Sequence, residues 1–441
     1  MQLRLGVIIG LLFVSSLCFK IFYVNDSSFG ANERKKDTLV LNLGALPIEL
    51  HPQFLSNSNS STISLHIYEG LFRLGTDKTV IPGLAENMLV SDDGLNYRIQ
   101  LRKSFWSNGL PLTAHDFVRS WKHAILPEDG KVCFGSMHFD FFTGVEEFRN
   151  GTSSWSNVAI VAEDDYTLLF TLKHPVPYFK DLLTLPVFYP IYQDYNTSSY
   201  LVTNGPFYVK SFKHEQSLIL KKNPFYWDAN AVNLSQIKFM FVESTKTQTL
   251  LFEQGELDCI GGGFLMVPQE DADRLSPSGC VSDQYDVATV SHLILNTKAP
   301  PFASHKVRLA FSMAIDREEL GRGIFKRSFP AYSYLPPSFS TRKGARLIQE
   351  SPQVAKLLLE EGLQDLGMSI EDLGEVRLLC SERGADGAQV LQRQWAEKLG
   401  VLIKIEILEF RSIFSCLKEG DFHMSISCIV ANYRDPYTFF D

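Results

Sequence analysis

The fold class of this chain is decided by residues 87–124, which read NMLVSDDGLNYRIQLRKSFWSNGLPLTAHDFVRSWKHA. Polar residues alternate with Tyr97, Ile99 and Leu101, which is the period of a strand with one buried face. The cluster Ser91–Gly94 precedes that strand and has the composition of a tight turn. The first half of the stretch therefore predicts two short strands joined by a turn.

The second half of the stretch predicts a helix. Asn108 and Gly109 form another turn signal, because Asn-Gly tolerates positive φ angles. Thr113 then occupies the cap position with Asp116 three residues later, which is the pattern of a capping box. An apolar face with a period of 3.6 residues follows, made by Phe117, Val118, Trp121, Ala124 and Ile125. None of these residues has a chemical role, so the stretch predicts scaffold.

The composition is that of a globular protein large enough for more than one core. The chain has 441 residues, of which 45% are hydrophobic and 21% are charged. This length predicts two or three lobes, because single cores stop growing at about 250–300 residues. The formal net charge of −8 gives no support for nucleic-acid binding, which usually needs a basic face.

The N-terminus has the composition of an export signal at residues 1–17. Arg4 precedes an apolar run that is shorter than a typical membrane span and close to the length of a signal core. Cys18 follows this run as a candidate lipid-attachment site, although Leu17 stands where such sites carry a small residue. Lipid anchoring, plain cleavage and an uncleaved anchor therefore stay open. Residues 18–37 predict a polar tether.

Six more cysteines are scattered along the chain, at Cys133, Cys259, Cys280, Cys380, Cys416 and Cys428. They form no C-x-x-C pair, which argues against a zinc ribbon or a thioredoxin motif. An exported protein can pair some of them, but their spacing does not give the connectivity. Isolated cysteines are more often core residues.

Strands and helices alternate through the rest of the chain, which predicts an α/β architecture. The expected strands are 38–43, 167–172, 218–220, 236–242, 289–296, 375–380, 401–408 and 422–430. The expected helices are 63–72, 245–254, 306–314, 352–361, 388–399 and 413–419. Residues 56–62 are expected as a polar loop. Gly362 is expected just past the end of the helix that Ser351 caps.

The sequence shows no catalytic or metal-binding pattern. It contains no H-E-x-x-H, G-x-S-x-G or P-loop motif, and its ten histidines lack metal-ligand spacing. The run Gly261–Gly263 lacks a following Lys-Ser or Lys-Thr, so we expect a loop there and not a phosphate cradle. Aromatic residues at turns fit either a ligand cleft or packing at domain edges. An enzyme is therefore disfavoured, and no metal or cofactor is expected.

A series of short motifs occurs along the chain in a distinctive order and spacing. They are Tyr68-Glu69-Gly70-Leu71, Pro82-Gly83-Leu84-Ala85-Glu86, 90–101, Trp106-Ser107-Asn108-Gly109, 112–117, Pro175-Val176-Pro177-Tyr178-Phe179, Thr203-Asn204-Gly205-Pro206-Phe207, Lys222-Asn223-Pro224, Tyr226-Trp227-Asp228, Gly255-Glu256-Leu257-Asp258, 301–317, Ala331-Tyr332-Ser333-Tyr334 and Pro336-Pro337. This order resembles the large solute-binding proteins of bacterial ABC importers, the oligopeptide and dipeptide class. The resemblance covers about residues 39–439.

The resemblance implies an α/β, two-lobed periplasmic-binding-protein-like fold, with an extra inserted lobe and a hinge between the lobes. Residues 38–70 and 202–288 would form lobe I, 71–201 the extra lobe inserted in it, and 289–441 lobe II. Closure of the lobes would bury a peptide ligand, paired like a strand, and present it to ABC permease subunits in the inner membrane. The implied protein is a periplasmic monomer that catalyses no reaction and uses no cofactor.

The resemblance also implies where the ligand contacts lie. They are expected at Asn432, Phe410, Ile429, Val430, Ser56 and Cys428. Peptide binders of this family typically carry an aspartate ahead of a Tyr-x-x-Pro turn, where it holds the α-amino group of the peptide. Here the turn is Tyr433-Arg434-Asp435-Pro436, and Asn432 stands at the aspartate position. Asn brings no charge, and a charge-assisted hydrogen bond is about twice as strong as a neutral one.

Other positions that match family ligand contacts have also changed. Phe410 and Ile429 match an aromatic wall where tryptophans are common, Ser56 matches an acidic position, and Leu417 and Ile426 match basic positions. The pocket is therefore expected to be less charged and more apolar than that of an oligopeptide binder. Our hypothesis is a changed or narrower ligand, such as a modified peptide.

The C-terminal end of this sequence differs from that of the family it resembles. Family members continue past this turn and return to the first lobe, whereas this sequence stops at Asp441. An incomplete lobe II and lower stability than that of a full-length relative are therefore expected. A ligand-binding sensor or a degenerate accessory protein, no longer coupled to transport, is the alternative to a transport component.

Overall fold

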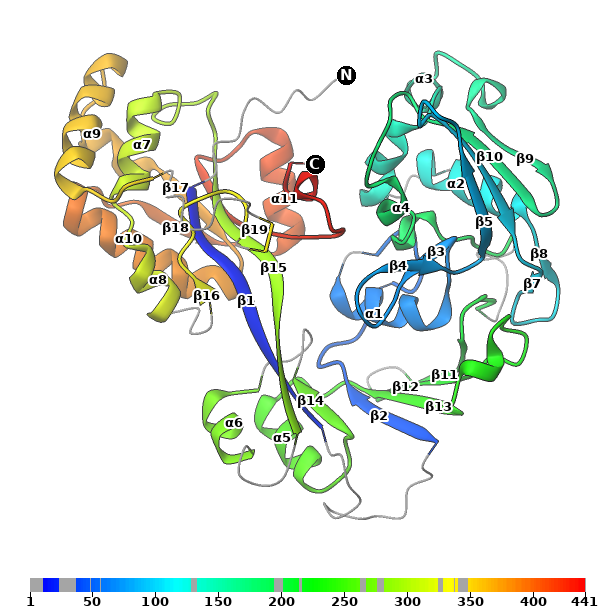
Figure 1. Ribbon diagram of the computed structural model, residues 1–441. Coiled ribbons are helices and arrows are strands. Elements are labelled where there is room, and N and C mark those ends of the chain that lie inside the picture. The colour runs from blue at the N-terminus through cyan, green and yellow to red at the C-terminus, as the bar shows by residue number, and fades with distance from the viewer. Residues whose placement is uncertain are drawn as a thin grey trace. The chain divides into compact units, whose positions relative to one another are not determined.

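The computed structural model contains two compact units (Figure 1). It describes residues 11–23, 37–47, 49–55, 57–127, 133–193, 201–213, 216–261, 267–275, 281–323, 328–336, 338–339 and 348–440. The N-unit comprises residues 20–283, and the C-unit comprises residues 1–19 and 284–441. Strands β1 (Leu11–Tyr23) and β15 (Val281–Leu295) contribute residues to both units.

The segment with export-signal composition is partly outside the described residues. Residues 11–23 form β1, which pairs antiparallel with β14 (Cys259–Gly261) and with β16 (Ser328–Phe329). Residues 1–10 and 24–36 are not described, so the export signal, the tether and lipidation of Cys18 stay predictions. Within the described residues, no helix has the length and apolar character needed to cross a membrane.

The N-unit contains one half of the large sheet, in the order β11-β12-β13-β2-β14. Both neighbours of β2 run parallel to it, which requires crossover connections and agrees with the predicted α/β class. Leu39 and Leu41 pack on the same face as α1, and Val40 packs on the opposite face with α5 and α6. The bounds are β2 (Thr38–Asn42), β11 (Phe207–Lys213), β12 (Ser217–Lys222), β13 (Gln236–Met240), α1 (Ser58–Ile67), α5 (Thr245–Glu253), α6 (Gln269–Leu275) and η4 (Ala229–Ala231).

The predicted polar loop at residues 56–62 is wrong from residue 58 onward, because α1 begins at Ser58. The side chain of Asn57 caps the helix by accepting a hydrogen bond from a first-turn amide at 2.8 Å. The hydroxyls of Ser61 and Thr62 donate to carbonyl oxygens one turn earlier, at 3.1 and 3.0 Å. Short polar side chains are typical of loops, but these hydrogen bonds allow them to lie inside a helix.

The remaining part of the N-unit is built on a second sheet, in the order β5-β6-β10-β9. Around it lie β3 (Phe72–Leu74), β4 (Val80–Pro82), β5 (Ala85–Val90), β6 (Asn96–Leu101), β7 (Ser104–Phe105), β8 (Pro111–Leu112), α2 (Ala114–Ile125), η1 (Phe134–Phe141), α3 (Val145–Arg149), η2 (Trp155–Asn157), β9 (Ile160–Asp164), β10 (Thr167–Thr171), α4 (Phe179–Leu182) and η3 (Pro186–Phe188). Figure 1 shows α2 against this sheet.

Residues 87–124 fold as the sequence predicts. Every second residue of β6 is buried, and these are the three apolar residues of the alternation. The Thr113 amide donates to the Asp116 carboxylate at 2.8 Å, which completes the capping box. Trp121 of α2 is fully buried and donates its indole N–H to the Phe188 carbonyl at 2.8 Å. The predicted scaffold role of this stretch agrees with its burial.

Three of the motifs quoted above meet at the buried carboxylate of Glu69. Tyr226 donates its hydroxyl to Glu69 at 2.8 Å, and the indole N–H of Trp227 donates to the other carboxylate oxygen. Asn204 bonds both the amide and the carbonyl of Glu69, at 3.2 and 2.8 Å. Arg73 forms an ion pair with the same carboxylate at 3.3 Å. Burial raises the pKa of Glu69, although the bonds from Trp227 and Tyr226 and the charge of Arg73 act in the opposite direction.

The C-unit contains the other half of the large sheet, in the order β15-β19-β17-β18. β15 is antiparallel to β19, whereas β17 runs parallel to both β18 and β19. The elements are α7 (His305–Met313), α8 (Arg317–Gly323), α9 (Pro352–Leu366), η6 (Glu371–Glu375), β17 (Arg377–Cys380), η7 (Glu382–Gly384), α10 (Ala385–Leu399), β18 (Lys404–Ile407), α11 (Phe410–Glu419), β19 (Met424–Val430) and η8 (Pro436–Phe439).

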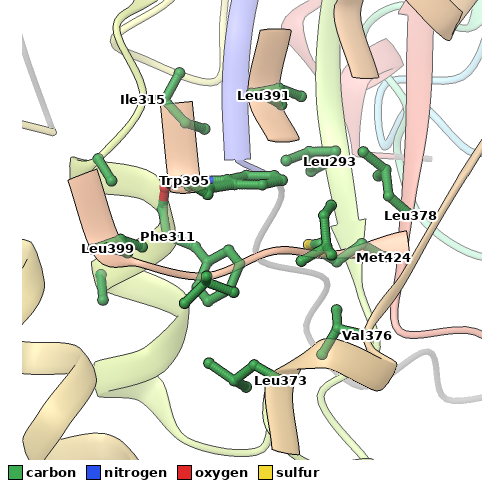
Figure 2. Packing of buried hydrophobic residues seen from close by; sticks show 14 of the residues in the cluster. Leu293, Phe311, Ile315, Leu373, Val376, Leu378, Leu391, Trp395, Leu399 and Met424 are labelled. Carbon is green, nitrogen blue, oxygen red and sulfur yellow. Dashed lines mark hydrogen bonds between the residues drawn. The ribbon is translucent and has the colours of Figure 1, made fainter. Parts of the chain in front are cut away.

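The core of the C-unit lies between one face of this sheet and helices α7, α9 and α10 (Figure 2). Leu293, Leu378 and Met424 come from three neighbouring strands and are each fully buried. Trp395 of α10 packs against Phe311 of α7 with ring centroids 5.1 Å apart, and its indole N–H donates to the Phe311 carbonyl at 3.0 Å. The indole therefore adds a directional bond between two helices to the apolar burial.

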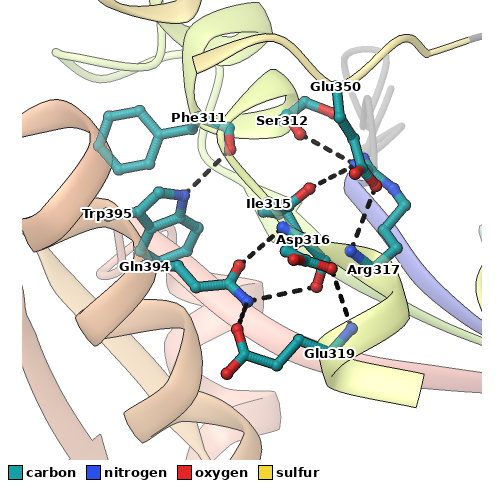
Figure 3. A network of polar contacts seen from close by, with 9 residues as sticks. All are labelled: Phe311, Ser312, Ile315, Asp316, Arg317, Glu319, Glu350, Gln394 and Trp395. Carbon is teal, nitrogen blue, oxygen red and sulfur yellow. Dashed lines mark hydrogen bonds and ion pairs between the residues drawn. The ribbon is translucent and has the colours of Figure 1, made fainter. Parts of the chain in front are cut away.

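A polar network fixes the connection between α7 and α8 (Figure 3). Gln394 of α10 accepts the Asp316 amide at 2.8 Å and donates to the Glu319 carboxylate at 2.6 Å. The fully buried Arg317 donates to the Ser312 and Ile315 carbonyls at 3.1 and 3.2 Å. These bonds satisfy carbonyls at the C-terminal end of α7, which have no partner inside the helix.

The prediction that Gly362 ends the Ser351 helix is wrong. Ser351 caps α9 as expected, but α9 continues to Leu366 and is closed by Gly367 in the left-handed conformation. Gly362 lies inside α9 because a methyl group there would stand 2.8 Å from Val307 of α7. Close packing of two helices therefore requires a glycine at this position. The sequence pattern does not distinguish such a glycine from one that ends a helix.

We expect Gly362→Ala to destabilise the protein by about 1–2 kcal/mol, because the new methyl group overpacks the contact with α7. Alanine inside a helix is otherwise more favourable than glycine by roughly 1 kcal/mol. Gly374→Ala is the matched control, since nothing lies within 4 Å of its added methyl group. Urea unfolding of both variants makes the comparison, and a Gly362→Ala variant as stable as the wild type would contradict the packing role.

Candidate functional site

The feature that stands out in the C-unit is an open backbone edge on β19. β19 pairs with β15 over its whole length, from Met424 to Val430. On its other side it pairs with β17 at Met424 and Ser425, and no further pairing occurs there among the described residues. The reason is that β17 ends at Cys380 and the chain turns into η7. The last part of β19 is therefore a sheet edge within the C-unit.

The register identifies which backbone groups face this edge. The amide of Ala431 donates to the carbonyl of Ala288, and the amide of Asn296 donates to the carbonyl of His423. In an antiparallel pair these hydrogen-bonded positions alternate, so Ile429 points its amide and carbonyl toward β15. Cys428 and Val430 consequently direct theirs away from β15, toward the open edge. No backbone partner of these two residues occurs in the described part of the chain.

The side chains of β19 alternate between two faces of the sheet. Cys428 and Val430 lie on the face that also carries Thr289, and both are exposed. The Thr289 hydroxyl lies 2.8 Å from the Cys428 sulfur and donates to the Ile429 carbonyl at 3.0 Å. Ile429 lies on the opposite face, so the structure separates it from the two exposed residues.

The opposite face is covered by residues of the segments 331–336 and 338–339 and by the end of the chain. Ile429 packs there with Val290, Ala331 and Phe439. Tyr334 stacks near Phe440 with ring centroids 5.2 Å apart, and its ring lies 6.2 Å from that of His292. Burial raises the pKa of Tyr334 and lowers the pKa of His292.

A compact turn, residues 431–440, follows β19. The amide of Asn432 donates to the Thr438 hydroxyl at 3.0 Å, while the Asn432 side chain is exposed. The carboxylate of Asp435 accepts the amide of Tyr437 at 2.9 Å and so caps η8. Asp435 is the one carboxylate within this described turn, and it is already engaged in holding the turn together.

The structure brings four of the six predicted site residues together. Cys428, Ile429, Val430 and Asn432 lie at the end of β19, with Ile429 on the covered face. Phe410 begins α11, and nothing of its side chain is described. Ser56 lies outside the described residues. Thr289, whose hydroxyl contacts the Cys428 sulfur and the Ile429 carbonyl, was not among the predicted site residues, although it begins the predicted strand 289–296.

The described residues hold no group of three or more His, Cys, Asp or Glu side chains that could bind a metal ion. The thiols of Cys133, Cys259, Cys380, Cys416 and Cys428 are free. What the C-unit offers is backbone hydrogen-bonding groups and small side chains along an exposed strand. Such a site suits the noncovalent binding of an extended ligand.

The fold and the open edge of β19 place the chain in the class of ligand-binding proteins built from α/β units. The chain belongs to the family of bacterial extracellular solute-binding proteins, family 5, whose middle region matches residues 79–441. It is therefore a solute-binding protein and not an enzyme, as the sequence predicts.

Known relatives and structures agree with this family. The chain is 29% identical over 427 residues to the oligopeptide-binding protein OppA of Bacillus subtilis, covering 93% of this chain and 78% of the relative. It is 31% identical over 427 residues to a dipeptide-binding protein of Lactococcus lactis, covering 88% of this chain and 76% of that protein.

Two solved structures show the same two-lobed fold. The periplasmic oligopeptide-binding protein OppAIV of Borrelia burgdorferi has a TM-score of 0.77 at 27% identity, over 92% of this chain and 82% of that one. Listeria monocytogenes OppA bound to peptide has a TM-score of 0.74 at 25% identity, over 92% of this chain and 84% of that one. The predicted fold class is confirmed.

Proposed function

We propose that this protein captures peptides outside the cytoplasm and delivers them to the membrane permease of an ABC importer. Its family supports solute binding, and the relatives named above bind oligopeptides or dipeptides. Capture by closure of the lobes follows from the resemblance. The ligand is an oligopeptide or a modified peptide.

The single observation that favours a peptide is the open edge of β19. An extended peptide presents alternating amide and carbonyl groups at the spacing of a strand. The backbone groups of Cys428 and Val430 match that pattern and have no other partner in the described residues. Pairing through the backbone gives affinity that is largely independent of peptide sequence, and pockets for alternate side chains add selectivity.

The turn after β19 supports a ligand whose α-amino group is not held by a charge. The exposed Asn432 side chain offers a neutral amide, and the nearby Asp435 carboxylate is engaged by the Tyr437 amide. A neutral amide favours a free amino terminus over a blocked one less than a carboxylate does, because it brings no opposite charge to the ammonium group. A peptide modified at its amino terminus therefore fits this turn.

We expect N-acetylation to change the affinity of a bound peptide by less than about threefold, because Asn432 places no opposite charge beside the amino terminus and no ion pair is lost. Calorimetry with one peptide in its free and acetylated forms measures this. Asn432→Asp is the matched variant, and it should prefer the free amine by about tenfold. Nanomolar binding of free-amine peptides that disappears on acetylation would overturn the modified-ligand proposal and leave peptide capture standing.

The rival function is a ligand sensor or accessory protein that no longer serves transport. Uptake of a labelled peptide by a permease-bearing strain separates the two. Uptake that depends on this protein supports the importer role, and peptide binding without any uptake supports the sensor.

Two further properties belong to this proposal. The protein acts as a monomer, which light scattering of the exported form checks. It is held at the membrane through its N-terminus, by a lipid on Cys18 or by the uncleaved segment. Intact mass of the exported protein tests this, since a soluble form lacking residues 1–18 would exclude both anchors.

A further inference from the structure

Strands β11, β12 and β13 of the N-unit present one face that carries a lysine from each strand. The register places Lys213, Lys221 and Lys238 on this face together with Tyr208 and Ile219. All five side chains are exposed or partly exposed. The residues that alternate with them point to the other face, where they join the core that contains α1. We call the exposed side the lysine face.

The helices on this side of the sheet cover a different part of it. Residues of α5 and α6 pack against Val40 of β2 and reach as far as Met240 at the end of β13. Among the described residues, that cluster includes none from β11 or β12. The lysine face therefore lies beside the covered part of the sheet.

The charge of the lysine face is not neutralised within the fold. Strands β11, β12 and β13 contain no acidic residue. In the described part of the chain, no ion pair includes Lys213, Lys221 or Lys238. The chain as a whole has a formal net charge of −8, so this local excess of positive charge runs against its average.

Protection of a sheet edge explains only one of these lysines. Lysines on edge strands discourage pairing with other chains. Lys213 lies on β11, which is an edge strand of the large sheet. Lys221 and Lys238 lie on β12 and β13, each of which has a neighbour on both sides. These two lysines therefore need another explanation.

The N-terminal part of the chain enters the fold in the same row of the sheet. Thr38, the first residue of β2, pairs with Gln236, which in turn pairs with Lys221. The carbonyl of Asp37 accepts the Ser235 amide at 2.8 Å, which fixes the point of entry. The predicted tether ends at this point, so the chain that leads to the proposed membrane anchor leaves the fold at the row that carries Lys221.

The chemistry of this face suits an extended anionic surface. A lysine ammonium group is a point charge that binds phosphate without the directed geometry of arginine. Tyr208 and Ile219 place an amphipathic and an apolar side chain among these charges, and tyrosine is enriched at the interface between membrane and water. A second copy of the chain is a poor partner, because pairing of two such faces would bring lysines together.

We propose that the lysine face docks on the anionic phospholipid headgroups of the membrane to which the N-terminus leads. This inference goes beyond peptide capture and does not depend on it. Each lysine at an anionic membrane surface strengthens binding by about fivefold. The three lysines together therefore contribute about 100-fold. A membrane tether would make this contact intramolecular and so raise its occupancy.

The test measures how the exported protein partitions onto two kinds of vesicle, by sedimentation. One kind is phosphatidylcholine, and the other contains equal parts of phosphatidylglycerol and phosphatidylcholine. The ratio of anionic to neutral binding is compared, because an apolar segment or a lipid anchor inserts into both. We expect Lys221→Gln with Lys238→Gln to lower this ratio about 25-fold. Salt at about 1 M, where the Debye length is about 3 Å, should remove the preference of the wild type.

The matched control is Lys103→Gln with Lys122→Gln, which removes the same charge from two exposed lysines outside β11, β12 and β13. It should keep the wild-type ratio. An equal loss in the control, an unchanged ratio in the Lys221 and Lys238 variant, or a preference that salt does not remove would overturn the proposal. A wild type without any preference would overturn lipid as the occupant, with an acidic protein as the alternative. Peptide binding, measured by calorimetry, should be the same in all three proteins, and its absence would overturn the proposed function alone.

Discussion

Replacing Val430 with proline is expected to lower peptide affinity by about 100-fold while the protein stays folded. Proline has no amide hydrogen, and the Val430 amide faces the open edge of β19. The variant would leave a ligand carbonyl without its partner, and the proline ring would occupy space that the ligand strand needs. Stability should change little, because proline is tolerated where the strand amide lacks a ladder partner.

Ile429→Pro is the matched control for this prediction. The Ile429 amide points to β15, so proline there removes a ladder bond and should lower the urea midpoint. Binding is measured by calorimetry with a peptide that co-purifies with the wild-type chain, and unfolding is followed by circular dichroism. If Val430→Pro is folded and keeps wild-type affinity, the ligand does not pair with this edge.

Replacing Glu69 with alanine is expected to destabilise the protein by about 3 kcal/mol. The Glu69 side chain is 5% exposed and accepts bonds from Tyr226 and Trp227. Alanine would leave both donors without their acceptor in a buried place. Arg73 loses one of its ion pairs as well, but Asp228 remains at 4.0 Å and the Arg73 side chain is 40% exposed, so this contribution is small.

Glu69→Gln separates hydrogen bonding from charge. The Gln side chain keeps one carbonyl oxygen and loses one acceptor, so we expect roughly half the destabilisation of Glu69→Ala. Urea unfolding of the three proteins gives the comparison. Surface substitutions usually change the free energy of unfolding by no more than about 0.5 kcal/mol. A Glu69→Ala protein that lies within this range of the wild type would show that the motifs are held together without this carboxylate.

The Glu69 cluster also explains what the sequence motifs are for. Glu69, Asn204 and the pair Tyr226 and Trp227 are far apart in the sequence and meet in one buried network. Their order along the chain indicated the family, and the structure shows that these residues are needed for packing. The structure therefore gives these motifs a role in the scaffold.

Local features were predictable where the controlling forces are local. The alternation in β6 and the capping box of α2 involve residues within one or two turns, so the sequence contained all that decides them. The cap at Ser351 was predicted for the same reason. Gly362 was misassigned because its true partner, Val307, is distant in sequence.

The ligand role of the candidate site residues stays a prediction, although the structure places four of them at the end of β19, where the resemblance pointed. The alternation of a strand does separate Cys428 and Val430 from Ile429. Which face is covered depends on the distant segment 331–339, and periodicity contains no information about that segment.

By itself the sequence determined the α/β class, the family and the scaffold of residues 87–124, because periodicity, caps and motif order act over short distances. Tertiary structure decided the rest. The open edge of β19 exists because β17 leaves the sheet after Cys380, and a glycine is required at position 362 because Val307 of α7 packs against it. Both depend on contacts between segments far apart in the chain.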